Sequence, residues 1–162
     1  MEENLHHGSP PGNAGSVRPG LRLTIAGKSS EIARANAAFT AFAEANAVPP
    51  AVRRSLNVAL DELLQNTIVH GFADPRGGGG GVSIAVELLP DRLTVTLTDD
   101  GQPFNPLAAA APDTARPLEE RPVGGLGIHL VRQLMDEVRY QRQGGHNVVV
   151  LIKRLTAGKP QD

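Results

Sequence analysis

The chain has 162 residues, a formal net charge of −1 at pH 7, no cysteine and an aromatic content of 3%. This length suits one globular domain with a core of aliphatic side chains. Without cysteine, disulfides, thiolate zinc sites and a cysteine nucleophile are excluded. The near-neutral charge and few aromatics argue against nucleic-acid binding. Apolar runs such as Val148–Ile152 are too short to span a bilayer. We expect a cytoplasmic protein without membrane or nucleic-acid contacts.

The first 20 residues are rich in Gly, Pro, Ser and Asn and lack the apolar stretch of a secretory signal. We expect a disordered leader over 1–20, a folded domain over 21–156 and a short tail over 157–162. The His6–His7 pair alone is not a metal site, since a site needs further ligands fixed in space.

The first half of the domain predicts one strand and two helices. Residues 21–25 alternate apolar and polar side chains, as a half-buried strand does. A serine of the pair Ser29–Ser30 can cap the helix that follows. Pro50 suits the first turn of a longer helix to about His70, closed by Gly71. The predicted apolar stripe of that helix is Val52, Leu56, Ala59, Leu60, Leu63 and Thr67.

The second half predicts two hairpins separated by a proline-rich loop and a helix. Consecutive hairpins favour an antiparallel or mixed, mostly antiparallel sheet, with the helices on one face. We therefore expect a two-layer α/β sandwich. The expected elements are strands Val82–Leu89 and Leu93–Thr98, a loop Asp100–Val123, a helix Leu126–Glu137, and strands Val138–Gln143 and Asn147–Leu155 joined through Gly144–Gly145.

Two glycine clusters look like phosphate loops but lack the required context. Gly27-Lys28-Ser29 lies between a strand and a helix, yet the first glycine of a P-loop would fall at Arg22, within the strand. The run Gly77–Gly81 precedes a strand, so it has no helix N-terminus to hold a phosphate. We interpret the run as a linker.

The first informative motif is on the long helix, where Glu62, Asn66 and His70 are spaced i, i+4, i+8 and share one side. Because this side flanks the apolar stripe, we expect Asn66 and His70 to be partly buried. An Asn carbonyl can ligate Mg²⁺, and a nearby Glu can accept a proton from a hydroxyl or water. The alternative is that all three are boundary residues with structural partners.

The second motif, Asp99 to Phe104, directly follows a strand. A carboxylate at a strand end can accept a hydrogen bond from an exocyclic amine such as that of adenine. Gly101 would let the backbone approach the ring, and Phe104 could wall the pocket. The alternative is a simple Asp-Gly turn.

The third motif, Gly124–Ile128, opens a helix whose free N–H groups and positive end favour phosphate. It is similar to a dinucleotide fingerprint, but Leu130 occupies the third glycine position and a long loop precedes it. Dinucleotide binding is therefore not expected. Each motif alone is a weak indication of a functional site. Together they are a stronger one, because they occur in one order and at helix and strand positions suited to their roles.

With these motifs in place, the chain resembles the GHKL ATPase superfamily and its Bergerat ATP-binding fold from Leu21 to Leu155. Glu62–Phe72 resembles the N-box, Asp99–Phe104 the first glycine box and Gly124–Val131 the second. Within the superfamily, these motifs are most similar to those of anti-sigma factor serine kinases.

The resemblance implies a site for ATP and Mg²⁺. Asn66 would coordinate the metal, and Glu62 would be the general base. Asp99 would bind the adenine amino group, with Gly101 beside the ring and Phe104 in the pocket wall.

The resemblance also implies a phosphate site at Gly125, Leu126 and Gly127, and an ATP lid over about 105–123. Arg116 or Arg121 of the lid is a candidate contact for the γ-phosphate.

Proteins of this family phosphorylate a serine or threonine on a STAS-domain anti-sigma factor antagonist and hold a sigma factor inactive, usually as homodimers. The resemblance implies these partners here. An ATP-hydrolysing or histidine-kinase-type domain is an alternative. So is a module that regulates a partner by nucleotide-dependent binding without phosphotransfer.

Overall fold

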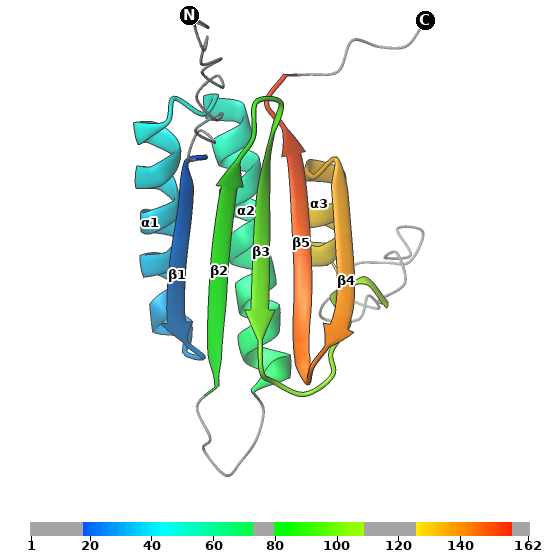
Figure 1. The fold of residues 1–162 in the computed structure, drawn as a ribbon. Coiled ribbons are helices and arrows are strands. Elements are labelled where there is room, and N and C mark those ends of the chain that lie inside the picture. Colours follow the sequence, from blue (N-terminus) through cyan, green and yellow to red (C-terminus); the bar gives the residue numbers. More distant parts are fainter. Residues whose placement is uncertain (1–17, 73–79, 109–125, 157–162) are drawn as a thin grey trace, which may run out of the picture.

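The computed structural model describes residues 18–72, 80–108 and 126–156. Five strands form one sheet in the order β1-β2-β3-β5-β4, and every neighbouring pair is antiparallel. The three α-helices lie together behind the sheet (Figure 1). The elements are β1 Gly20–Ala26, η1 Ser29–Glu31, α1 Ile32–Ala45, α2 Pro50–Asn66, η2 Thr67–Gly71, β2 Gly81–Leu88, β3 Arg92–Asp99, η3 Pro106–Ala108, α3 Leu126–Leu134, β4 Glu137–Gln143 and β5 His146–Arg154.

The predicted two-layer α/β sandwich is confirmed, and in the described residues its sheet is antiparallel rather than mixed. The β4–β5 hairpin turns at Gly144 and Gly145, with φ of 58° and 80°. Left-handed conformations at both positions suit a two-residue hairpin loop, as the sequence indicated. None of the helices in the described ranges is long and apolar enough to cross a membrane.

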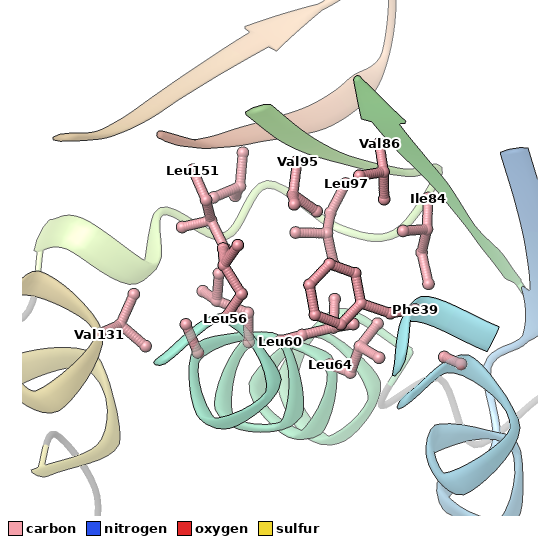
Figure 2. Packing of buried hydrophobic residues seen from close by; sticks show 14 of the residues in the cluster. Phe39, Leu56, Leu60, Leu64, Ile84, Val86, Val95, Leu97, Val131 and Leu151 are labelled. Atoms are coloured by element: carbon pink, nitrogen blue, oxygen red, sulfur yellow. The ribbon is translucent and has the colours of Figure 1, made fainter. Parts of the chain in front are cut away.

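The core lies between the sheet and the helices, where aliphatic side chains from both layers interdigitate (Figure 2). The predicted stripe of α2 is buried there from Val52 to Leu63, whereas Thr67 is only half-buried. Leu64, which the prediction left out, is fully buried. The helix thus presents a stripe wide enough to contact the sheet on one side and the neighbouring helices on the other.

Two end regions differ from the sequence-based expectation. Neither Ser29 nor Ser30 caps α1, because they form a 3-10 turn and the N-cap, Glu31, makes no side-chain cap hydrogen bond. The last helix ends at Leu134, not Glu137. The N–H of Asp136 donates to the Ile152 carbonyl at 3.0 Å, so pairing with the sheet replaces the last helical turn.

The inward rows of β3 and β5 each end on a polar residue. On β3 the buried residues Leu93, Val95 and Leu97 are followed by Asp99, which is 6% exposed. On β5 the buried row starts at Asn147, which is 3% exposed and directly opposite Asp99 in the register. They are the buried polar residues of the described chain, so the core has a polar end there.

Candidate functional site

The first two sequence motifs meet at one end of the sandwich, the lower end in Figure 1. There α2 and β3 end, and β5 begins. The start of α3 approaches α2 at Glu62. Motifs that are far apart in the sequence are therefore brought to one place by the topology.

The C-terminal turn of the long predicted helix is not α-helical. After Asn66 the chain continues as the π-helical turn η2, Thr67–Gly71. A π-turn has more residues per turn than an α-helix, so it rotates the residues that follow it away from an i, i+4, i+8 line. His70 is consequently exposed, which corrects the expectation that it is partly buried.

The imidazole of His70 nevertheless contacts a second motif. Its ring stacks on Phe104 with a centroid separation of 5.2 Å and an interplanar angle of 27°. The Phe104 side chain is half-buried beneath it. The two rings join the end of α2 to the loop after β3 and form one wall of the candidate site.

Asn66 is half-buried, as expected, and its orientation is set by its own helix. Its Nδ2 donates to the Glu62 carbonyl at 3.0 Å. Because the amide nitrogen is engaged, Oδ1 points away from that carbonyl. Within residues 18–72, 80–108 and 126–156, Oδ1 accepts no hydrogen bond from another side chain or the backbone. Among these residues it is therefore free to act as an oxygen ligand.

Glu62 is half-buried and lies against the first turn of α3. A β-carbon built on Gly127 would lie only 2.0 Å from Oε2 of Glu62 and 2.9 Å from its carboxyl carbon. A side chain at position 127 would therefore push the Glu62 carboxylate out of this place. The contact places the carboxylate beside the N-terminal end of α3, where unpaired backbone N–H groups gather.

Asp99 is held by two donors at the buried end of β3. Its Oδ1 accepts from the Gly101 N–H at 3.0 Å and from Asn147 Nδ2 at 2.9 Å. A β-carbon on Gly101 would lie 2.7 Å from the Gly71 carbonyl oxygen and 2.9 Å from Asp99 Oδ1. The N–H of Gln102 donates to the same Gly71 carbonyl at 3.1 Å. The first and second motifs are thus in direct contact.

Three residues of this network were not predicted from the sequence: Asn147, Tyr140 and Arg142. The Tyr140 hydroxyl and an Arg142 guanidinium nitrogen each donate to Asn147 Oδ1 at 2.9 Å. The sequence could have indicated Asn147, because it lies on the same face of its strand as the buried residues Val149 and Leu151. A polar residue in an inward row needs partners.

The glycine clusters set aside in the sequence have packing roles where they are described. A β-carbon on Gly27 would lie 2.6 Å from the Phe72 ring, and one on Gly80 would lie 2.0 Å from it. Gly81 belongs to β2 rather than to a linker. Phe72, at the end of the first motif, is therefore held between two glycines.

Several predicted features lie outside the described residues. They are Gly125, Arg116, Arg121, most of the expected lid, His6–His7, and residues 77–79 of the glycine run. Leu126 begins α3, although its side chain is not described.

Comparisons with known proteins identify the family of this chain. The model of the family described as "Histidine kinase-like ATPase domain" matches residues 25–153. Serine/threonine-protein kinase BtrW of Bordetella bronchiseptica is 29% identical over 100 residues, which cover 62% of this chain and 69% of that protein. Serine-protein kinase RsbW of Bacillus subtilis is 32% identical over 101 residues, 59% of this chain and 61% of RsbW.

A further RsbW, from Halalkalibacterium halodurans, is 30% identical over 94 residues, 56% of each chain. The matches to the two RsbW proteins thus span less than two thirds of their length.

Among solved structures, the RsbU and RsbW domains of Rv1364c from Mycobacterium tuberculosis match with a TM-score of 0.61 and 17% identity. The match covers 84% of this chain and 32% of that one. At this identity the likeness concerns the fold. The family model, however, spans most of the folded region and includes all three motifs. The chain therefore belongs to the histidine kinase-like ATPase domain family, the GHKL group, and resembles within it the RsbW-type serine kinases.

Proposed function

We propose that this chain is an ATP-dependent serine/threonine protein kinase and anti-sigma factor of a partner-switching module. It would phosphorylate a STAS-domain anti-sigma factor antagonist and sequester a sigma factor, as a cytoplasmic homodimer. The names of the relatives support the kinase activity, since BtrW and RsbW are both called protein kinases. The partners follow from the resemblance of the three motifs to those of anti-sigma factor kinases.

The observation that carries the proposal is the contact between Glu62 and Gly127. The start of a helix suits phosphate groups, because its N–H groups are unpaired and its dipole is positive there. A carboxylate against this turn would lie beside the phosphate that reacts. The backbone of Gly125, Leu126 and Gly127 would bind the phosphates.

At the other side of the site, Asp99 would bind the adenine amino group. Both donors described for its carboxylate bind Oδ1, which leaves Oδ2 to accept the exocyclic N–H. Gly101 would allow the ring to lie close to the backbone, and Phe104, braced by His70, would cover one side of it.

Asn66 fits the role of a Mg²⁺ ligand. Its Oδ1 is free of hydrogen bonds within the described chain, and it lies one helical turn beyond Glu62. No cluster of three or more acidic or histidine side chains that could hold a metal occurs in the described residues. Mg²⁺ is usually held by one or two protein oxygens, with phosphate oxygens and water as its other ligands. When bound, Mg²⁺ neutralises phosphate charge and fixes the geometry of the triphosphate.

Phosphoryl transfer needs positioning and charge stabilisation more than covalent help from the protein. The acceptor hydroxyl oxygen would form a bond to the γ-phosphorus while the bond to the β-phosphate oxygen breaks. The Glu62 carboxylate would orient the hydroxyl and take its proton, and ADP would leave with the bridging oxygen.

The test is transfer of ³²P from [γ-³²P]ATP to a purified STAS-domain protein encoded in the same genome. Glu62→Gln should retain ATP binding but lower the transfer rate about 100-fold or more, because the proton acceptor is lost. The matched control is Glu44→Gln, which changes an exposed glutamate in the last turn of α1, away from the candidate site. Transfer by Glu62→Gln at the wild-type rate would exclude the base assignment. Capture of a sigma factor without any transfer would favour the binding-module alternative.

A further inference from the structure

We infer that Asn147 is a positioning residue of the nucleotide site, which holds the Asp99 carboxylate in the orientation that selects a purine with an amino group at C6. The inference rests on the proposed ATP binding, but it concerns residues that neither the motifs nor the proposal includes. It starts from the contact of Asn147 Nδ2 with Asp99 Oδ1 at 2.9 Å.

The polarity of its partners fixes the orientation of the Asn147 amide. Nδ2 faces two acceptors, Asp99 Oδ1 and the Gln102 carbonyl at 2.8 Å. Oδ1 faces the guanidinium of Arg142 at 2.9 Å and the Phe104 N–H at 3.3 Å. Guanidinium and backbone N–H groups can only donate, and a carbonyl can only accept. A flipped amide would therefore lose all of these hydrogen bonds.

The position is also closed to water. Asn147 is 3% exposed and Asp99 is 6% exposed. A buried carboxylate needs hydrogen-bond donors, since leaving it without partners is costly. Of the two donors to Asp99 Oδ1, Gly101 N–H belongs to a loop. Asn147 belongs to β5, which pairs with strands on both sides. Asn147 is thus the donor that ties the carboxylate to the rigid sheet.

A second layer of contacts holds Asn147 itself. The Tyr140 hydroxyl donates to its Oδ1 at 2.9 Å. Arg142 donates both to this oxygen and to the Gly101 carbonyl, at 2.9 and 3.0 Å. Tyr140 and Arg142 are on the edge strand β4, on the far side of β5 from Asp99. The β4–β5 hairpin therefore braces both the carboxylate and the loop that follows it.

The consequence is base selectivity. With Oδ1 engaged, Oδ2 is the acceptor that can meet the exocyclic N–H of adenine. A purine that lacks this amine has no donor for Oδ2, and guanine presents a carbonyl oxygen in its place, so the buried acceptor would remain unpaired. If Asn147 no longer fixed the carboxylate, Asp99 could rotate and the preference for adenine would fall.

The experiment compares the Kd of ATP with that of purine riboside 5′-triphosphate, which lacks only the exocyclic amine. Both are measured by calorimetry on the full chain with Mg²⁺. Asn147→Leu, which keeps the branched shape but has no polar groups, should weaken ATP binding about tenfold and analogue binding less than twofold. Equal weakening of both nucleotides would show a purely structural role and overturn the inference.

Asp99→Asn separates the inference from the proposed function. If the wild type binds both nucleotides equally, or Asp99→Asn leaves its preference for ATP unchanged, the adenine contact itself is wrong. If Asp99→Asn removes the preference and Asn147→Leu does not, the adenine contact stands and the inference about Asn147 falls. The double variant should show no further loss of preference beyond Asp99→Asn alone.

Two milder variants keep the inference testable if Asn147→Leu does not fold. Tyr140→Phe and Arg142→Gln each remove donors to Asn147 Oδ1 while leaving its contact with Asp99 in place. Each should lower the ATP-to-analogue preference about two- to fivefold. If both variants kept the wild-type preference for ATP over the analogue, Tyr140 and Arg142 would not hold Asn147 in the way inferred here. Arg139→Gln, an exposed change on the same strand, should leave the preference as in the wild type.

Discussion

Oε2 of Glu62 lies 2.0 Å from the point that a β-carbon on Gly127 would occupy. The proposed base and the proposed phosphate-binding turn therefore lie so close together that a side chain at position 127 would displace the Glu62 carboxylate. This contact joins α2 to α3, and Asp99 lies at the end of the neighbouring strand β3.

Gly127→Ala should cost about 0.5–1.5 kcal/mol, because the new methyl group forces the end of the flexible Glu62 side chain out of its preferred position. In a Glu62→Ala background the obstructing carboxylate is gone. There the same change should be neutral, or stabilising by up to about 1 kcal/mol from helix propensity. Urea unfolding of the wild type, both single variants and the double variant measures this difference. Equal costs in both backgrounds would contradict the contact.

Asn66→Ala should weaken ATP binding in the presence of Mg²⁺ and leave binding in EDTA unchanged, since it removes an oxygen ligand and no base contact. We expect a loss of about tenfold or more in Mg²⁺. Titration of a fluorescent ATP analogue under both conditions provides the measurement. Gln65→Ala, the exposed neighbour, is the control. A loss of the same size in EDTA would assign Asn66 to a different role.

Gly101→Ala and Gly71→Ala should differ although both glycines are in the site. A β-carbon on Gly101 would lie 2.7 Å from a backbone carbonyl oxygen, whereas one on Gly71 would have its nearest neighbour at 3.7 Å. The Gly101 variant should lose about 1–3 kcal/mol of stability and most of its ATP affinity. The Gly71 variant should retain both within a small margin. Thermal melting with and without ATP compares the two.

Gly80→Ala should lower the melting temperature more than Gly81→Ala, its immediate neighbour. A β-carbon on Gly80 would lie 2.0 Å from the Phe72 ring, while one on Gly81 would meet its nearest atom at an ordinary 3.4 Å. We expect a cost of about 1–3 kcal/mol for the first change. Differential scanning fluorimetry is sufficient to rank the melting temperatures of the two variants. A reversed ranking would exclude the close packing of the Phe72 ring against Gly80.

Leu64→Ala should cost about 2–5 kcal/mol, because a fully buried leucine leaves a cavity between the helices and the sheet. Val58→Ala on the same helix should change stability by less than about 1 kcal/mol, since this side chain is 39% exposed. The free energy of unfolding of the two variants measures the contrast. Similar values would show that α2 packs with a different face.

The sequence by itself determined most of the secondary structure and the candidate motifs, because these depend on local periodicity and turn chemistry. The alternation in β3 predicted its buried face, and the glycine pair 144–145 predicted the turn of the last hairpin. Local signals also misled. The helical pattern continues beyond Leu134, but there the chain pairs with the sheet instead. The π-turn η2 leaves His70 exposed, although the helical spacing predicted that it is partly buried.

Only the tertiary structure decided which side chains meet. Asn147 and Asp99 are 48 positions apart, and their contact depends on β5 pairing with β3 in one register. A shift of β5 by one residue would turn the Asn147 side chain to the other face of the sheet, away from Asp99. The approach of Glu62 to Gly127 likewise requires the packing of α3 on α2, which no local pattern encodes. Contacts of this kind arise from the burial of distant apolar surfaces together, so the geometry of the site comes from the folded core.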